Sequence, residues 1–277
     1  MLRLLKSLYY RLRGFSLRSL RNEVLLTQAL KAGTEVNWLA SYPRSGNTWT
    51  RLVTADYLLR ANGFEDYNLQ HEVSRIIPDF AQHDIQSIGF AGNALPLIIK
   101  THDNCLQLSA KYDKSESHKV RCVCLFRNPE DVLTSFFHYR HRGIQANSSQ
   151  QNSIDQFVLN HLDSWVQHIQ SYLNHDPSRT FFLAYEKLIS DPLPYFSQLL
   201  GWYGIKTNQN HLQAAIDSNT FAKLRHEERK HGGSSNSLFY RRGRSGGGLE
   251  ELSNKTLERV WSSSSSIYAE AVSRMNN

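Results

Sequence analysis

The chain has 277 residues, 40% of them apolar, which is enough to bury the core of one large domain. Its 32 Lys and Arg outnumber its 25 Asp and Glu, and the net charge of +7 favours anionic partners such as nucleotides, nucleic acid or acidic lipid. Three cysteines make an odd count, which argues against a disulfide framework. No stretch approaches the roughly 20 apolar residues of a membrane span, and no signal-peptide core follows the first charges, so we expect a cytoplasmic protein.

A basic amphipathic segment comes first, "MLRLLKSLYYRLRGFSLRSLR", in which Arg and Lys are interleaved with Leu, Tyr and Phe and no acid occurs before Glu23. Such a helix can pack on a domain or lie on an anionic membrane surface, and both interpretations stay open. We divide the chain into this segment, residues 1–30, and one domain over residues 31–277.

Along the domain, short apolar runs that suit buried parallel strands alternate with segments of helical spacing. We expect strands at 35–41, 95–100, 120–126 and 180–185. We expect helices at 48–63, ended by Gly63, at 128–142, begun by an Asn128 cap and Pro129, at 155–173, and after the serine tract near the C-terminus. This order predicts a three-layer α/β domain with a central, mainly parallel sheet.

The loop between the first strand and its helix reads "SYPRSGNTW", residues 41–49. Its backbone N–H groups can point at one anion near the positive end of the helix, where Gly46 permits close approach and Arg44 adds charge. By itself the stretch also fits an ordinary helix start. A nucleoside-triphosphate loop would end in Lys-Ser or Lys-Thr, and the absence of that ending argues against a nucleotide kinase.

This loop resembles the phosphosulfate-binding loop of the cytosolic-type sulfotransferases, usually written YPKSGTTW, with Arg44 in place of lysine. Four more motifs similar to that family follow in order: "KTH" (100–102), "RNPEDVLTS" (127–135), "AYEKL" (184–188) and "FYRRG" (239–243). The resemblance runs from about residue 36 to 245. It implies a P-loop-like sulfotransferase fold for the domain, with 3'-phosphoadenosine 5'-phosphosulfate (PAPS) as the donor and no metal.

The resemblance also implies which residues bind the donor. The loop at 41–49 would hold the 5'-phosphosulfate, and three aromatic rings would stack on adenine. An Arg–Ser pair would hold the 3'-phosphate together with the late loop, which begins at 239–243 and continues to about residue 249. The loop set is Arg44, Ser45, Gly46, Asn47 and Thr48; the aromatic set is Trp49, Tyr185 and Phe221; the 3'-phosphate set is Arg127, Ser135, Arg241, Arg242 and Gly243.

His102 is the predicted catalytic base. It follows Lys100 at the carboxyl end of an expected strand, where open α/β sheets place their ligands, and a neutral imidazole can take the proton of an acceptor hydroxyl. Lys100 and Arg44 would stabilise the charge that develops as the sulfuryl group moves in line. We expect the acceptor to be a hydroxyl or an amine, carried by a small molecule, a lipid, a glycan or a peptide tyrosine, and we expect residues 64–94 and 136–153 to line its pocket.

Two departures from the family pattern stand out. Gly247, Gly248 and Leu249 replace the Asp, Trp and Lys of the family's late loop, which predicts a more flexible loop. Arg44 keeps the charge of lysine but changes its geometry.

One alternative from another class is a noncatalytic protein that binds nucleic acid or a membrane surface through its positive charge. That reading leaves His102 and Lys100 beside two phosphate sites unexplained, so we expect no nucleic-acid partner.

Overall fold

The computed structural model describes residues 17–85, 96–112, 120–141, 154–230, 239–240 and 243–276. Arg241 and Arg242 therefore lie outside the described residues. The α-helices and strands are α2 (Leu17–Lys31), β1 (Val36–Ser41), α3 (Asn47–Ala61), α4 (Leu69–Ile76), β2 (Leu97–Thr101), α5 (Cys105–Tyr112), β3 (Val120–Phe126), α6 (Pro129–Arg140), α7 (Ile154–Leu173), β4 (Thr180–Ala184), α8 (Tyr185–Ser190), α9 (Pro192–Trp202), α10 (Gln209–Ser218), α11 (Phe221–Lys230), α12 (Gly247–Glu251) and α13 (Asn254–Ser273).

The described strands form one sheet in the order β2-β1-β3-β4, and each neighbouring pair is parallel. All four overlap the runs expected from sequence. The chain moves from β1 to one neighbour, β2, and then crosses to the other neighbour, β3. Open α/β sheets bind their ligands at such a switch point, outside the carboxyl ends of the strands. The strand order therefore directs attention to the ends of β1, β2 and β3.

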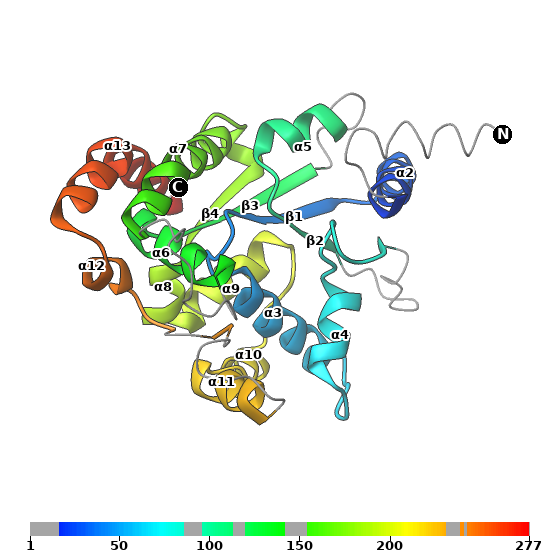
Figure 1. Cartoon of the computed structure of the whole chain (residues 1–277). Coiled ribbons are helices and arrows are strands. Elements are labelled where there is room, and N and C mark those ends of the chain that lie inside the picture. Colours follow the sequence, from blue (N-terminus) through cyan, green and yellow to red (C-terminus); the bar gives the residue numbers. More distant parts are fainter. Residues whose placement is uncertain are drawn as a thin grey trace.

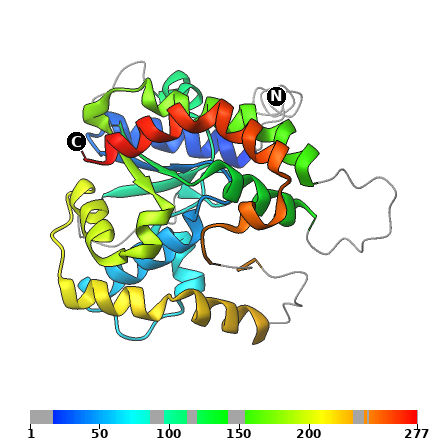
Figure 2. The same cartoon turned by 90° about the vertical axis from the view of Figure 1, so that its left-hand side faces the viewer.

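Helices cover both faces of the sheet, so the expected three-layer α/β architecture is confirmed (Figures 1 and 2). One face buries Trp38 and the cysteines Cys122 and Cys124 beneath α2, α5, α6, α7 and α13. The opposite face buries Leu39 and Val123 beneath α3, α4 and α8 to α11. All three cysteines are buried and unbridged.

The ends of α3 and α6 show how local sequence signals act. After α3, Gly63 adopts a φ of 78° and donates its N–H to the Arg60 carbonyl, as the expected glycine stop requires. Pro129 begins α6 as expected. The Asn128 side chain, however, makes no capping hydrogen bond within the described residues. The Glu186 carboxylate instead accepts the Asn128 N–H at 2.9 Å, a partner that only the tertiary fold supplies.

The expectation that the last helix follows the serine tract is wrong, because α13 runs through it. Serine hydroxyls inside a helix can bond to a carbonyl one turn earlier, and here Ser264 donates to the Val260 carbonyl at 2.7 Å. Val260, Ser264 and Ala271 are fully buried on one side of α13. Burial of this stripe outweighs the low helix propensity of serine.

The described part of the N-terminal segment packs on the domain. Leu26 and Leu30 of α2 are buried in the core, and fully buried Asn22 donates to the carbonyls of Phe80 and His83. Residues 1–16 lie outside the described part of the chain, so their membrane contact stays a prediction.

Candidate active site

The loop after β1 contains two residues with a positive φ. Arg44 has a φ of 74° and Gly46 a φ of 101°, both in the left-handed region. A β-carbon on Gly46 would lie 2.4 Å from Cδ2 of Tyr185, so only glycine fits. Ser45 is fully buried and donates both its N–H and its hydroxyl to the Tyr42 carbonyl. The side chain of Ser45 thus closes the turn.

The N-terminus of α3 follows this turn directly. Gly46 is its N-cap, and no side chain among the described residues caps it. The first N–H groups of a helix have no partner inside the helix, and they carry its positive dipole end. Thr48 lies half-buried in this first turn. The first turn of α3 therefore offers backbone N–H groups to an anion, and the anion site predicted from the loop sequence stays a prediction.

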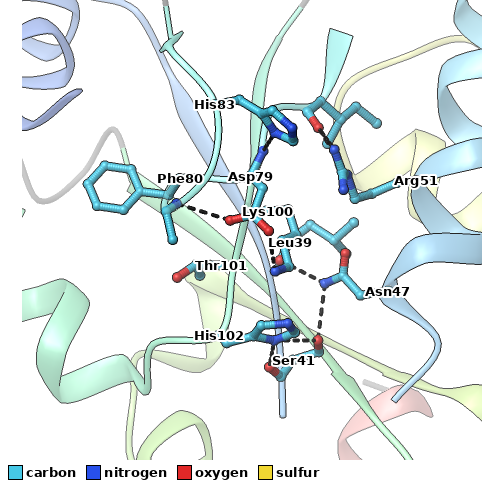
Figure 3. A network of polar contacts seen from close by, with 12 residues as sticks. Leu39, Ser41, Asn47, Arg51, Asp79, Phe80, His83, Lys100, Thr101 and His102 are labelled. Carbon is cyan, nitrogen blue, oxygen red and sulfur yellow. Dashed lines mark hydrogen bonds and ion pairs between the residues drawn. The ribbon is translucent and has the colours of Figure 1, made fainter. Parts of the chain in front are cut away.

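Asn47 uses its side chain to connect the loop to β1. Its Nδ2 donates to the Leu39 carbonyl at 3.2 Å and lies 3.1 Å from the Ser41 hydroxyl, while Oδ1 is buried without a partner in the described chain (Figure 3). The side chain is thus committed to the strand, and only the backbone N–H of Asn47 remains for an anion.

Arg44 reaches toward α6 and the late loop. Its Nε donates to the Ser135 hydroxyl at 3.3 Å, and its Nη2 donates to the Phe239 carbonyl at 2.9 Å. The guanidinium lies 4.0 Å from the ring centroid of Phe239 and 5.1 Å from that of Tyr139. The structure therefore places Arg44 with the predicted 3'-phosphate residue Ser135.

Arg127, at the end of β3, meets the same loop from the other side. It donates to the carbonyls of Arg44, at 3.4 Å, and Arg244, at 3.1 Å, and it covers the Tyr185 ring at 4.5 Å. Asp131 lies 3.7 Å from its Nη2. The sequence expected Arg127 and Ser135 to converge, and the structure joins them through Arg44.

The three predicted adenine-stacking rings have different surroundings. The Trp49 indole donates to the Asn219 carbonyl at 2.8 Å. Phe221 lies under Gly243, where a β-carbon would come within 2.2 Å of the ring, so the late loop touches this aromatic directly. Tyr185 is buried, and its ring contacts Gly46 and Arg127. Tyr185 therefore supports the loop, while Trp49 and Phe221 keep half-buried rings.

His102 follows the end of β2, next to the loop (Figure 3). Its Nδ1 lies 2.7 Å from the Ser41 carbonyl, and because a carbonyl oxygen only accepts, Nδ1 carries the proton and Nε2 is free to accept one. His102 keeps solvent-exposed surface. Desolvation of the ring by the atoms packed around it, followed by the charge of Lys100, lowers the pKa of His102 from its ordinary value to about 4. The imidazole is therefore neutral at physiological pH.

Lys100 lies near the end of β2, two residues before His102, and it has a partner that the sequence analysis missed. Its Nζ lies 2.5 Å from the Asp79 carboxylate, and both residues are buried. Asp79 stands in the apolar run "RIIPDFA", and that isolated acid was the available signal. An acid among apolar residues is usually either exposed or paired, and sequence alone does not show the partner.

The late loop is tied down at two places. The Glu228 carboxylate accepts the N–H groups of Phe239 and Tyr240. The Asp131 carboxylate accepts those of Gly246 and Gly248, each at 2.9 Å.

The three residues that depart from the family pattern were expected to make this loop flexible, but they form part of helix α12. A β-carbon on Gly248 would lie 2.6 Å from the Glu130 backbone, so glycine allows α12 to pack directly on α6.

Within the described residues, no group of three or more His, Cys, Asp or Glu side chains could hold a metal ion. None of the helices in that part of the chain is long and apolar enough to cross a membrane.

Comparison with known proteins gives a consistent result. The model of the sulfotransferase domain matches residues 35–266. The chain belongs to the sulfotransferase family. A flavonol 3-sulfotransferase from Flaveria bidentis is 23% identical over 270 residues, which cover 87% of this chain and 84% of that protein. An amine sulfotransferase from Oryctolagus cuniculus is 21% identical over 195 residues, and the match spans 62% of its length.

Solved structures show the same fold. A mouse sulfotransferase in complex with PAP (adenosine 3',5'-bisphosphate) has a TM-score of 0.60 at 20% identity, covering 95% of this sulfotransferase and 92% of the mouse chain. A retinol dehydratase in complex with retinol and PAP has a TM-score of 0.59 at 18% identity, covering 84% and 80%. The predicted family, fold and enzyme class are thus confirmed, and at the level of the family so is the PAPS donor.

Proposed function

We propose that this sulfotransferase moves the sulfuryl group of PAPS to a hydroxyl or amine of a small-molecule acceptor, with His102 as the general base. The acceptor oxygen or nitrogen forms a bond to sulfur as the bond from sulfur to the phosphate oxygen breaks. Nε2 of His102 takes the acceptor proton, and PAP leaves. The observation that supports this role is the hydrogen bond from Nδ1 to the Ser41 carbonyl, which holds Nε2 unprotonated beside the donor loop.

On the donor side, we propose that the first N–H groups of α3 hold the 5'-phosphosulfate. Arg127 and Ser135 would hold the 3'-phosphate, together with Gly243 and the late-loop arginines Arg241 and Arg242. Arg44 and Lys100 would stabilise the charge that develops on the transferring group. Trp49 and Phe221 would flank adenine. Arg44 and Arg127 lie at the same turn, where they donate to the Ser135 hydroxyl and to backbone carbonyls, and guanidinium groups are suited to binding phosphate oxygens.

Calorimetry without magnesium tests the donor site. PAP should bind at least tenfold more tightly than adenosine 5'-monophosphate or ATP, a difference of about 1.4 kcal/mol. Equal affinities would contradict the 3'-phosphate site. A preference for ATP that appears with magnesium would instead favour a kinase.

The base is tested with PAPS and a panel of 2-naphthol, an aliphatic alcohol and an arylamine. His102→Ala should lower kcat about 10²- to 10⁴-fold with PAP affinity kept. His71→Ala is the matched control, because His71 lies exposed on α4. Since the pKa of His102 is lowered, activity should be lost only as pH falls well below 6.5. An acid limb at or above that pH would contradict the assignment.

The acceptor class and location are further parts of this proposal. Relatives of this chain include proteins named for flavonols and amines, and the expected pocket segments 64–94 and 136–153 combine apolar and aromatic side chains. Residues 86–94 and 142–153 of these segments lie outside the described part of the chain. We propose a cytoplasmic enzyme whose residues 1–16 contact anionic lipid. Vesicles containing phosphatidylserine should bind the full chain and release it at high salt. Equal binding to neutral vesicles would contradict an electrostatic contact.

A further inference from the structure

Residues 77–80 lie beside the end of β2 and pair with Lys100 through their backbone. Lys100 donates its N–H to the Pro78 carbonyl at 2.8 Å, and Phe80 donates its N–H to the Lys100 carbonyl at 2.9 Å. These bonds form an isolated parallel bridge between Asp79 and Lys100. The backbone at the end of β2 is therefore fixed at Lys100, the residue whose side chain carries the positive charge.

The side chains repeat this pairing. The Asp79 carboxylate accepts from Nζ of Lys100 at 2.5 Å and from the Ala81 N–H at 3.0 Å (Figure 3). Asp79 is 4% exposed and Lys100 is 7% exposed. Removing one member of such a pair leaves the other as an uncompensated buried charge. Lysine can escape that penalty by losing its proton.

The groups that face Lys100 come from three elements. Arg51 of α3 is buried and donates to the Ile77 carbonyl through Nε and Nη2. His83 follows Asp79 and accepts the Asp79 N–H, so its Nδ1 is unprotonated. His102 and Asp103 follow Lys100 on its own chain end. Lys100 is thus in direct contact with the Asp79 carboxylate, and Arg51 is a second cation close enough to feel its charge.

The charges act in a definite direction. Burial lowers the pKa of Lys100, and Asp79 opposes that effect. Burial would raise the pKa of Asp79, but the charge and hydrogen bond of Lys100, together with the Ala81 N–H and His102, leave that pKa below its ordinary value. Without Asp79, both burial and Arg51 would favour loss of the Lys100 proton.

We propose that Asp79 is a positioning residue for sulfuryl transfer, whose carboxylate keeps Lys100 protonated and directed to the reacting end of the donor beside His102. This inference rests on the proposed function. Asp79 acts through Lys100 and touches no reacting atom. A merely structural Asp79 would change stability and leave the ionisation of Lys100 untouched.

Titration of Lys100 without any ligand tests whether Asp79 keeps this lysine protonated. The full chain is labelled with ¹³C at lysine Cε, and the Lys100 resonance is assigned from Lys100→Arg. In Asp79→Asn the midpoint of Lys100 should fall by at least one pH unit. Asp84→Asn is the matched control, since Asp84 lies on the same segment and pairs with Arg21 at the surface. An unchanged midpoint in Asp79→Asn overturns the proposal.

Turnover of PAPS with the best acceptor of the panel tests the catalytic part. At pH 9, where Lys100 of Asp79→Asn should be neutral, the kcat of this variant should be as low as that of Lys100→Met. At pH 6, where Lys100 should be protonated again, the kcat of Asp79→Asn should be at least tenfold higher than that of Lys100→Met. PAP affinity should change less than threefold. A loss that is equal at both pH values overturns the proposal. Failure of the wild-type chain to bind PAP or turn over any acceptor would count against the proposed function, while the titration still decides the role of Asp79 toward Lys100.

Asp79→Glu keeps the carboxylate one methylene away and serves if Asp79→Asn does not fold. Its Lys100 midpoint should stay within half a pH unit of wild type, with kcat reduced because the ammonium has moved. An unaltered kcat and pH profile in this variant also overturns the proposal.

Discussion

The ends of β2 and β3 each lie beside a buried acid, but the two acids have opposite surroundings. Asp79 beside β2 has the ammonium of Lys100 at 2.5 Å, and the pKa of Asp79 is lowered. Glu130, at the start of α6 after β3, has an Oε2 atom without a hydrogen-bond partner in the described chain. Burial, followed by the nearby Asp131 and Glu186, raises the pKa of Glu130 to about 7. Similar burial thus shifts the two pKa values in opposite directions, because Asp79 has a cation in contact and Glu130 forms no ion pair among the described residues.

The difference has a functional meaning. At the β2 end the cation is balanced, which suits a site where one sulfuryl group and one proton move. At the β3 end, Arg127 donates to carbonyl oxygens and has the Asp131 carboxylate at 3.7 Å, and that carboxylate also accepts two backbone N–H groups. The cation at the β3 end thus has a more distant acid than Lys100 has, at the place where a phosphate is expected to bind.

Shape, not charge, should produce the largest effect, at the β1 loop between these two ends. Gly46→Ala must adopt a left-handed φ and push aside the Tyr185 ring, and we expect a loss of roughly 3 kcal/mol or more in the free energy of unfolding. PAP binding should fall below detection. Urea unfolding and calorimetry measure both.

Gly63→Ala is the control for this variant. Gly63 has a similar positive φ, but nothing lies within 4 Å of a β-carbon there, so only about 1–2 kcal/mol should be lost. Equal losses in the two variants would show that the Tyr185 contact is unimportant.

The contrast between the two acids is sharpened by Glu130→Gln. A raised pKa means that the folded state holds the proton more tightly, so the stability contributed by protonated Glu130 is present below its ordinary pKa of 4.5 and is lost as pH rises toward about 7. The variant should therefore be more stable than wild type at pH 8, by at most about 3 kcal/mol, and nearly equal to it at pH 4.5.

Urea unfolding at the two pH values checks this, with the exposed Glu65→Gln as a control that should change stability by less than about 0.5 kcal/mol. A gain of the same size at both pH values would mean that the charge of Glu130 is irrelevant.

Removing the positive charge of Arg127 at the end of β3 should change the affinity for PAP and not the pH dependence of binding. Arg127→Ala should weaken PAP binding about 10²-fold through lost charge-assisted hydrogen bonds, with adenosine 5'-monophosphate affected less than threefold and no dependence on pH between 6 and 9. Calorimetry with both nucleotides measures this. Arg121→Ala is the control, because Arg121 lies on the same strand and stacks on Trp202. Equal weakening for both nucleotides would remove Arg127 from the 3'-phosphate site.

The smallest effect is expected at the tether of the late loop. Glu228→Gln replaces a charged acceptor of the Phe239 and Tyr240 N–H groups by a neutral one, which should weaken PAP binding about three- to tenfold, or roughly 1 kcal/mol. Glu227→Gln, a neighbouring exposed site paired with Lys230, should leave PAP affinity unchanged. An equal change of PAP affinity in both variants would mean that the loss of one negative charge, and not the tether of the late loop, causes the effect.

Much of the fold was predictable because its signals are local. The four strands lie within a few residues of their expected positions, and Gly63 and Pro129 end and begin their helices as expected. The serine tract was misjudged because serine propensity is a weak local preference, while the buried stripe of α13 depends on partners far away in sequence. For the same reason Asn128 predicted a helix start correctly and its capping bond wrongly.

By itself, the sequence determined the family, the layer order and the residues gathered at the strand ends, since motif spacing and hydrophobic period are properties of the chain alone. Only the tertiary structure decided which of those residues meet. It directed Arg44 to Ser135 and Phe239, turned the Asn47 side chain back to β1, and placed Asp79 against Lys100. A buried charge takes its ionisation and direction from whatever group the fold brings within a few ångströms, and that group is separated by 21 residues in the case of Asp79 and Lys100.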